Sequence, residues 1–273
     1  MSDVGGRTAG DPRTILAMGG GGFTMQERAP GLDRLVLSLT GKEVPRICFL
    51  PTASGDPRDQ VRWFYERYEG WPCEPSILSL FHLGRDRIDP IAHLLAQDAI
   101  YVGGGSLRNM LAIWREHGID AAMRTAWERG IVLAGLSAGA MCWFEGGVSK
   151  SGGMPEVVVG IGLLPGSLSV HMHGEPDRLP VYEYAVATGE LPPGYAADDG
   201  AAVLFRGTSI AESVVSDPDA SVVRIEADGQ GSVTRTPQPV RVLPGAAGQQ
   251  LPATETFAVS EMRALRAGRN RWD

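Results

Sequence analysis

The segment IVLAGLSAGAM, residues 131–141, decides how the chain is interpreted. It begins as an apolar run typical of a buried strand and ends in small residues that favour a helix. At the junction, Ser137 stands between Gly135 and Gly139, in the Gly-x-Ser-x-Gly pattern of a tight strand-to-helix turn. Such a turn presents a hydroxyl at the edge of a sheet and at a helix N-terminus. Ser137 is therefore a candidate nucleophile, and the simpler alternative is that it only caps the helix.

Strand-like and helix-like stretches alternate before this segment. The apolar runs that predict strands lie at 14–18, 46–54, 75–81 and 98–106. This alternation predicts an α/β fold with a mostly parallel sheet and helices on both faces. Glycine clusters at 19–22, 103–105 and 135–139 follow three of the strands, so they are expected to meet at the carboxyl edge, where such sheets bind ligands. The glycines at 19–22 are themselves interpreted as a plain loop.

Composition and charge are those of an ordinary globular protein. Hydrophobic residues make up 43% and charged residues 21%, and the net charge of −7 argues against nucleic acid as a partner. No apolar run is long enough to span a membrane, and the first residues lack the apolar core of a signal peptide. The three cysteines are scattered and fit neither a disulfide framework nor a zinc site. A cytoplasmic protein without a metal or other cofactor is expected.

The chain is expected to form one domain. Residues 1–13 are predicted to be a disordered lead, and residues 14–273 a single α/β domain with a C-terminal extension after about residue 226. Turn signals at Asp228-Gly229 and Pro244-Gly245 predict antiparallel strands in this extension. The other elements predicted for the second half are a helix at 177–188, a loop at 249–256 and a closing helix at 258–268.

A nucleophilic serine needs a base, and the base needs an acid that orients it. Of the five histidines, His171 and His173 lie in a short strand-like run after a Pro-Gly turn, and strand alternation would place both on one face. No acidic or cysteine ligands accompany them at a metal-binding spacing, so a general base is favoured over a metal site. The residue types alone leave the acid open among Glu175, Asp177, Glu183, Asp198 and Asp199.

Four motifs, in order along the chain, resemble one known family. They are YVGGGSLRNML (101–111), GLSAGAM (135–141), GIGLLPGSLSVHMHGEPDR (160–178) and LPPGYAADDGAAVLFRG (191–207). From about residue 14 to residue 226 the chain is similar to the peptidase E family, the aspartyl dipeptidases, with cyanophycinase as a relative. The resemblance implies a flavodoxin-like fold akin to that of class I glutamine amidotransferases, and a serine exopeptidase for dipeptides with an N-terminal aspartate.

The resemblance also implies roles for individual residues. It places the nucleophile at Ser137 and the general base at His171. It places the orienting acid at Asp199, where the best-known relatives carry glutamate, with Asp198 as the alternative. Because aspartate is one methylene shorter than glutamate, the backbone must then approach the histidine more closely.

The same resemblance implies an oxyanion hole and a substrate contact. The N–H groups of Gly104 or Gly105 and of Ala138 would stabilise the oxyanion. Arg178 falls near the place of a basic residue that holds the substrate carboxylate, and the alternative is an arginine exposed in the first turn of a helix. His173 is a second candidate for contact with substrate, at a position where many relatives carry another residue.

Three other interpretations stay open at this point. A glutamine amidotransferase-like enzyme would use a cysteine, and Cys142 follows Ser137 by five residues. An α/β-hydrolase esterase shares the serine turn but carries its acid before its histidine in the chain. A family member of different specificity, such as an isoaspartyl or other acyl hydrolase, or a catalytically silent one that binds a small ligand, would keep the fold. A small peptide substrate is the expected partner, and a homodimer is left open.

Overall fold

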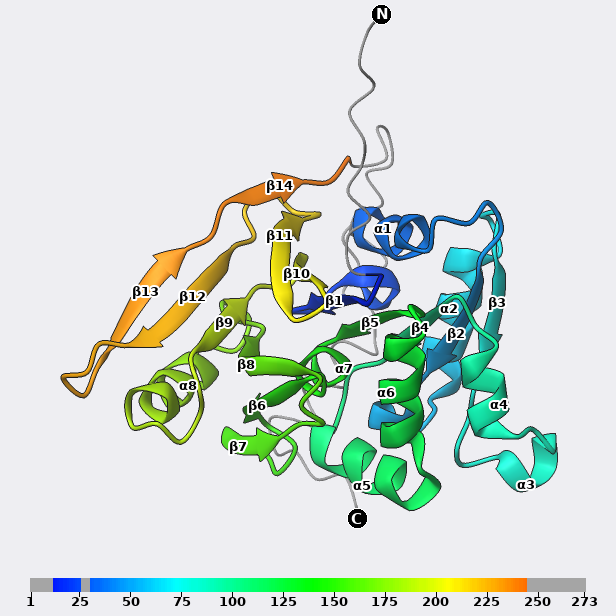
Figure 1. The fold of residues 1–273 in the computed structure, drawn as a ribbon, viewed down its shortest axis with the longest axis horizontal. Coiled ribbons are helices and arrows are strands. Elements are labelled where there is room, and N and C mark those ends of the chain that lie inside the picture. The colour runs from blue at the N-terminus through cyan, green and yellow to red at the C-terminus, as the bar shows by residue number, and fades with distance from the viewer. Residues whose placement is uncertain (1–11, 26–29, 245–273) are drawn as a thin grey trace, which may run out of the picture.

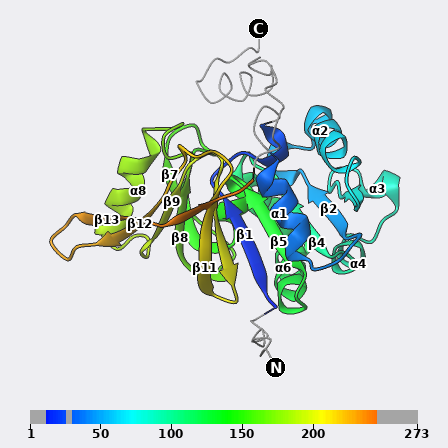
Figure 2. The ribbon, with the colours of Figure 1, turned by 90° about the horizontal axis from the view of Figure 1, so that it is seen from above.

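Two β-sheets lie side by side in the computed structural model, which describes residues 12–25 and 30–244 (Figures 1 and 2). The first sheet has the strand order β14-β11-β10-β1-β5-β4-β2-β3. The five strands from β1 to β3 in this order are parallel, while β10 is antiparallel to β1, and β11 to β10. Its strands are β1 (Thr14–Met18), β2 (Arg46–Leu50), β3 (Glu74–Ile77), β4 (Ala99–Val102), β5 (Val132–Leu136), β10 (Ala201–Arg206), β11 (Ser209–Val215) and β14 (Val240–Val242).

Helices cover both faces of the parallel strands (Figure 1). Alternate strand residues point to opposite faces, so Leu133 packs in one apolar cluster and its neighbours Val132 and Ala134 in another. One face carries α1 (Gly31–Leu39) and α2 (Arg58–Tyr68), and the other α5 (Leu107–His117) and α6 (Ile119–Glu128). Two short helices, α3 (Leu83–Asp86) and α4 (Pro90–Leu95), follow β3 in the chain, and α4 packs against α6. The predicted doubly covered sheet is confirmed.

A second sheet was not predicted. Its strand order is β13-β12-β9-β8-β6-β7. Its elements are β6 (Phe144–Ser149), β7 (Glu156–Val159), β8 (Leu164–Val170), β9 (Gly194–Ala197), β12 (Val222–Ala227), β13 (Val233–Pro237) and the covering helix α8 (Arg178–Ala187). Periodicity identifies these strands but does not say which strands pair, because pairing depends on contacts between residues far apart in the sequence. In Figure 2 this sheet and α8 lie on the opposite side of β1 from α2 and α3.

The predicted antiparallel strands of the C-terminal part are confirmed only in part. β12 and β13 form an antiparallel hairpin whose turn contains Asp228. β14 instead returns to the first sheet and pairs with β11 in parallel, so the antiparallel expectation is wrong for it. The predicted strands at 46–54, 75–81 and 98–106 are also too long, because β2, β3 and β4 end at Leu50, Ile77 and Val102. Gly245 and the predicted segments 249–256 and 258–268 lie outside the described residues, as does most of the predicted lead at 1–13.

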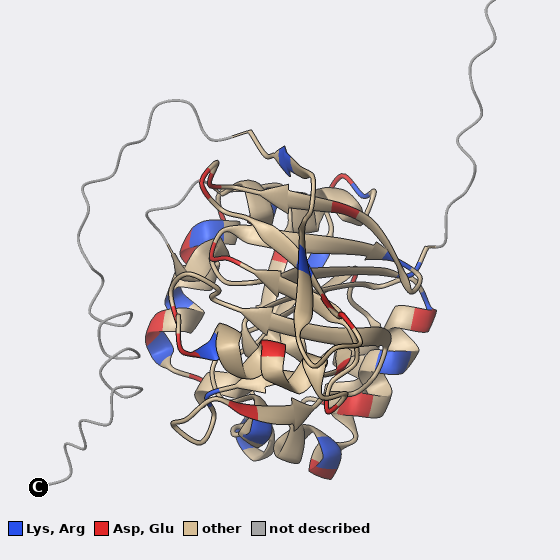
Figure 3. Cartoon of the chain, turned by 90° about the vertical axis from the view of Figure 1, so that its left-hand side faces the viewer, with Lys and Arg blue, Asp and Glu red and all other residues tan. Residues whose placement is uncertain are grey.

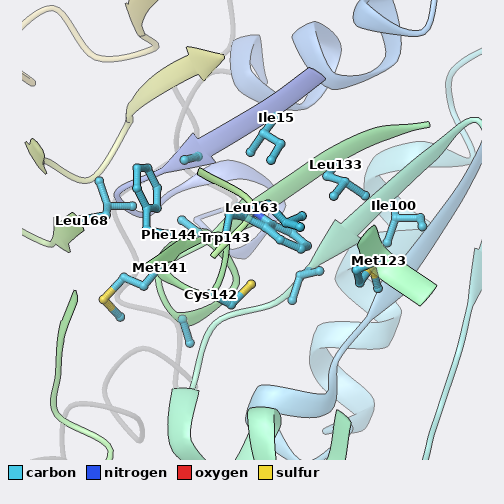
Figure 4. Packing of buried hydrophobic residues seen from close by; sticks show 14 of the residues in the cluster. Ile15, Ile100, Met123, Leu133, Met141, Cys142, Trp143, Phe144, Leu163 and Leu168 are labelled. Atoms are coloured by element: carbon cyan, nitrogen blue, oxygen red, sulfur yellow. The ribbon is translucent and has the colours of Figure 1, made fainter. Parts of the chain in front are cut away.

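The chain crosses from the first sheet to the second through a buried apolar junction (Figure 4). Trp143 and Phe144 follow the serine turn directly and are fully buried. The ring of Trp143 lies 6.1 Å from that of Trp114 on α5, and the ring of Phe144 lies 5.6 Å from that of Phe205 on β10. One apolar cluster therefore includes residues of both sheets, and it fixes the second sheet against the end of the first.

Charged residues of both signs are interspersed over the described elements in the view of Figure 3. Among the residues that the structure describes, none of the helices is both long and apolar enough to cross a membrane. The expectation that neither nucleic acid nor a membrane is a partner stays a prediction.

A buried carboxyl group lies under the loop that follows β1. Asp33 of α1 is fully buried and accepts hydrogen bonds from the N–H of Phe23, at 3.1 Å, and from the hydroxyl of Tyr68, at 3.3 Å. Burial raises the pKa of Asp33 from 3.8 to about 6, although Arg67 opposes the shift. The folded protein therefore holds a proton at Asp33 over a pH range in which the unfolded chain has lost it.

We expect Asp33→Asn to change how stability depends on pH. A raised pKa in the folded state means that the free energy of unfolding of the wild type falls as the pH rises from about 3 to 7, by about 3 kcal/mol from this group. Asparagine does not titrate, so its contribution to the free energy of unfolding does not change with pH. The difference in this free energy between variant and wild type should therefore shift in favour of the variant as the pH rises. Denaturant unfolding at pH 4 and pH 7 measures this, with the exposed Asp59→Asn as control. A difference between variant and wild type that does not change with pH would contradict it.

Candidate active site

Ser137 occupies a strained turn between β5 and the short helix α7 (Ala138–Met141). Its backbone angles are φ 53° and ψ −114°, a conformation that non-glycine residues rarely adopt. A Cβ atom at Gly135 would overlap the carbonyl oxygen of Gly139, and one at Gly139 would overlap that of Val102 on β4. The two glycines are therefore needed for the turn to fit between strands. The predicted tight turn around Ser137 is present, and its strain is of the kind that collects at functional sites.

The side chain of His171 lies between Ser137 and Asp199. Its Nε2 atom is 2.9 Å from Ser137 Oγ, and its Nδ1 atom is 2.5 Å from Asp199 Oδ1. Both distances are those of hydrogen bonds, and the second is short. The structure thus brings together the serine, the histidine and the acid that the resemblance to peptidase E implied.

The three residues meet because the two sheets meet. Ser137 follows β5 of the first sheet, and His171 follows β8 of the second. Asp199 stands in the turn that leads from β9 of the second sheet to β10 of the first. The turn is tied to the loop after β1, because the N–H of Gly200 donates to the carbonyl oxygen of Gly20 at 3.0 Å. The site is therefore formed by loops at the junction of the sheets.

Asp198, the alternative acid, has different partners. Its Oδ1 accepts from the N–H of His173 at 3.0 Å and lies 2.8 Å from His173 Nδ1. Its Oδ2 accepts from the N–H and the hydroxyl of Ser221, at 2.9 and 2.8 Å. With its side chain only 6% exposed, Asp198 ties two loops together, and the geometry assigns the contact with His171 to Asp199 instead.

The expectation that His171 and His173 share one face of a strand is wrong. β8 ends at Val170, and His171 has a positive φ of 54° that turns the chain. The side chain of His173 is 75% exposed, whereas that of His171 is 12% exposed. Alternation applies only where the backbone is extended, and here the backbone reverses instead. His173 is thus an exposed neighbour of the site, and its contact with substrate stays a prediction.

The glycines after β4 differ in what they approach. A Cβ atom at Gly104 would lie 3.2 Å from the Cβ atom of Ser137, so the backbone of Gly104 passes beside the serine. A Cβ atom at Gly105 would overlap the backbone at Ala53, so Gly105 faces the loop after β2. Among the described residues, we find no acceptor for the N–H groups of Gly104, Gly105 and Ala138. These groups are candidates to donate to a substrate oxygen.

Arg178 is buried, which excludes the alternative of an exposed arginine in the first turn of a helix. It begins α8, and its Nη2 atom donates to Glu175 Oε2 at 2.6 Å. The N–H of Glu175 in turn donates to the carbonyl oxygen of His171 at 2.8 Å. The pair is thus joined to the turn that carries the histidine, and a negative charge already lies against the guanidinium.

Sequence reasoning missed Gly20. A Cβ atom there would overlap Asp199 Oδ1 and lie 2.8 Å from the Cε1 atom of His171. The run of four glycines after β1 is the available signal, but the sequence alone favours a plain loop there. Runs of glycine mark both turns and close approaches of the backbone, and only the fold distinguishes the two.

Two chemical alternatives lose support from the geometry. Cys142 is fully buried, donates to the carbonyl oxygen of Gly139, and has a pKa that burial raises well above its ordinary value. A thiol of this kind is not a nucleophile. The acid that contacts His171 follows it in the chain, which is not the α/β-hydrolase order. Within the described ranges, we find no group of three or more His, Cys, Asp or Glu side chains that could hold a metal ion.

Comparison with known proteins adds the family. The sequence profile described as Peptidase family S51 matches residues 15–213, a span that contains Ser137, His171 and Asp199. The chain belongs to peptidase family S51. This S51 peptidase is also 42% identical over 231 residues to the uncharacterized peptidase YgaJ of Bacillus subtilis (strain 168), a match that covers 85% of this chain and 99% of that protein.

Solved structures share the fold of the S51 peptidase. A peptidase from an acI-B1 Actinobacterium has a TM-score of 0.62 at 17% identity, and the match covers 85% of this chain and 96% of that one. A candidate peptidase E protein of Listeria monocytogenes EGD-e has a TM-score of 0.53 at 18% identity, covering 72% and 96%. At these identities the likeness shows the fold alone. With the family assignment it confirms the resemblance to peptidase E, and the protein is a serine peptidase.

Proposed function

We propose that this serine peptidase hydrolyses small peptides through a relay of Ser137, His171 and Asp199. The observation that carries the proposal is the pair of contacts of one imidazole ring, 2.9 Å to the serine hydroxyl and 2.5 Å to the carboxylate. A serine hydroxyl is a poor nucleophile at neutral pH unless a base takes its proton. The ring is within reach of that proton, and the carboxylate holds the ring in place.

In the first half of the reaction, Ser137 Oγ attacks the carbonyl carbon of the substrate while its proton passes to His171 Nε2. The resulting imidazolium is stabilised by Asp199 at Nδ1. The negative charge that develops on the carbonyl oxygen is met by the N–H groups of Ala138 and of Gly104 or Gly105. The loss of one such donor typically raises the barrier by about 2.7–4 kcal/mol. The C–N bond then breaks, and the amine leaves with the proton from His171.

In the second half, water replaces the amine. His171 takes a proton from water, the hydroxide oxygen attacks the acyl carbon, and the ester bond to Ser137 Oγ breaks as His171 returns the proton. Every proton in this cycle moves through the one imidazole. The chemistry is complete with the side chains and backbone groups of the described residues.

Dipeptides with an N-terminal aspartate are the substrates that we propose for this site. The support is the resemblance to peptidase E together with the buried guanidinium of Arg178. Backbone hydrogen bonds through Glu175 connect Arg178 to His171. A guanidinium binds a carboxylate with two parallel hydrogen bonds. Glu175 competes for it at 2.6 Å, so the preference for aspartate depends on how the two carboxylates share Arg178.

We expect Glu175→Gln to increase the preference for aspartate. The variant removes the negative charge next to Arg178 but keeps the backbone bond from residue 175 to His171. KM for Asp-Leu should fall roughly fivefold relative to KM for Ala-Leu, a change of about 1 kcal/mol. Glu212→Gln is the matched control, because Glu212 pairs with Arg241 and not with Arg178. An unchanged ratio in Glu175→Gln would place the carboxylate contact elsewhere.

A substrate panel tests the proposed function. The full chain is assayed with Asp-Leu, Ala-Leu, an isoaspartyl dipeptide, a blocked Asp-Leu without a free amino group, and a simple ester. Hydrolysis of Asp-Leu above all others supports the proposal. Preference for the isoaspartyl peptide, or for the ester without any dipeptide cleavage, would replace it with another acyl hydrolase of the same family. Cytoplasmic location and assembly as a homodimer stay predictions.

A further inference from the structure

The loop after β1 closes over the hydrogen bond between His171 and Asp199. A Cβ atom at Gly20 would overlap Asp199 Oδ1 and lie 2.8 and 2.9 Å from the Cε1 and Nδ1 atoms of His171. These are the two groups joined by the short bond of 2.5 Å. The φ angle of Gly20 is outside the left-handed range, so no left-handed backbone conformation requires a glycine at this position. A side chain at this position would instead collide with the side chains of Asp199 and His171.

Two backbone hydrogen bonds hold Gly20 at this distance. The N–H of Gly19 donates to the carbonyl oxygen of Ala201 at 2.9 Å, and the N–H of Gly200 donates to that of Gly20 at 3.0 Å. The loop and the turn that carries Asp199 are therefore tied together at the two residues that directly follow the acid. A displacement of residue 20 must move the carboxylate or break these bonds.

The far end of the loop is anchored in the core. The N–H of Phe23 donates to Asp33 Oδ1 at 3.1 Å, and the Phe23 ring lies 4.9 Å from that of Phe49 and 5.2 Å from that of Tyr101. All of these groups are buried. The loop is thus fixed at β1 and again at residue 23, which leaves residue 20 little room to withdraw.

A second glycine lies close to the same carboxylate. A Cβ atom at Gly174 would lie 3.1 Å from Asp199 Oδ2, a tighter approach than ordinary packing allows. The side chains of His171 and Asp199 are only 12% and 16% exposed. The pair is thus largely shielded from solvent, and a hydrogen bond in such surroundings is electrostatically stronger than one in water.

We propose that Gly20 is a positioning residue of the S51 peptidase, whose missing side chain allows the backbone to seal the contact between His171 and Asp199. This inference rests on the proposed relay. Gly20 acts through the two side chains that it covers and takes no part in proton transfer. A methyl group at position 20 separates the imidazole from the carboxylate, so that the ring loses its orientation while Ser137 and the oxyanion donors stay in place.

Gly20→Ala tests the proposal. We expect kcat to fall about 10²- to 10³-fold, less than the roughly 10⁴-fold that follows complete loss of an orienting acid. KM for the dipeptide should stay within about threefold, because residue 20 is not in the proposed substrate contacts. The acid limb of the kcat/KM profile should move to lower pH, since the imidazolium form loses its partner. A purely structural defect would lower the amount of active enzyme and leave this limb in place.

A double-mutant cycle gives the sharpest reading. In the Asp199→Asn background the relay is already impaired, so adding Gly20→Ala should cost less than about threefold in kcat. Full additivity of the two changes would overturn the proposal. Gly70→Ala is the matched control, since a Cβ atom there meets no atom within 4 Å. If Gly20→Ala does not fold, Gly174→Ala applies the same test, because a Cβ atom at Gly174 would lie 3.1 Å from Asp199 Oδ2, a less severe contact than at position 20. Wild-type kcat in Gly174→Ala would then overturn the proposal.

The outcome is separable from that of the proposed function. Wild-type kcat and an unmoved pH profile in Gly20→Ala, together with an inactive Ser137→Ala, would reject the role of Gly20 and keep the relay. Hydrolysis that survives in Ser137→Ala would reject the relay, whatever Gly20→Ala shows.

Discussion

Replacing Ser137 or His171 with alanine is expected to reduce peptide hydrolysis by about 10⁴- to 10⁶-fold without unfolding the protein. The serine supplies the atom that attacks the substrate, and the histidine is the only base seen within hydrogen-bond distance of that atom among the described residues. Removal of either should cost about as much as removal of both, because neither works alone. Steady-state kinetics of the two single variants and the double variant, with thermal unfolding as a check of the fold, measure this.

His173→Ala is the control for the histidine. It removes an imidazole two residues away that is 75% exposed and faces Asp198. The variant should keep activity within about tenfold of the wild type, since it leaves the contact between His171 and Ser137 intact. An inactive His173→Ala beside a nearly normal His171→Ala would move the base to residue 173 and reject the assignment.

The second large effect is expected at Asp199. Asp199→Asn should lower kcat by about 10⁴-fold, because an amide can hold His171 in the wrong tautomer and cannot stabilise the imidazolium. The neighbouring Asp198→Asn should behave differently. Both oxygens of its carboxylate accept hydrogen bonds, from His173 and Ser221, so the NH2 group of an asparagine would face another donor. We expect a loss of about 1–3 kcal/mol in stability and little change in kcat.

Kinetics and unfolding of the two aspartate variants separate these roles. We expect an activity defect at residue 199 and a stability defect at residue 198. The reverse pattern would move the orienting acid by one residue and would conflict with the 2.5 Å contact between His171 and Asp199.

The serine turn and the parallel sheet were predictable because both depend on short-range patterns. Apolar runs with helices between them predict a covered parallel sheet, and Ser137 between two glycines predicts the strained turn. The choice of Asp199 over Asp198 came from the resemblance to a family, and residue types alone left it open. A one-residue choice of this kind depends on the direction of two side chains in a turn, which no periodicity encodes.

What the sequence could not predict depends on contacts between distant segments. The second sheet pairs β6, β8, β9 and β12, which are separated by helices and turns. The positive φ at His171 reverses the chain where strand alternation was expected, and it turns His173 out to solvent. Gly20 approaches Asp199 across about 180 residues of chain, so only the fold distinguishes it from the glycine of an ordinary loop.

Covalent labelling of Ser137 tests the central claim most directly. The wild type, His171→Ala and His173→Ala are incubated with a fluorophosphonate, and the rate and site of labelling are read by peptide mapping. We predict that the label appears on the peptide that contains Ser137, at similar rates in the wild type and His173→Ala and about 10³-fold more slowly or not at all in His171→Ala. Labelling of Ser137 at the wild-type rate without His171, or no labelling of Ser137 in an active wild-type enzyme, would contradict the account.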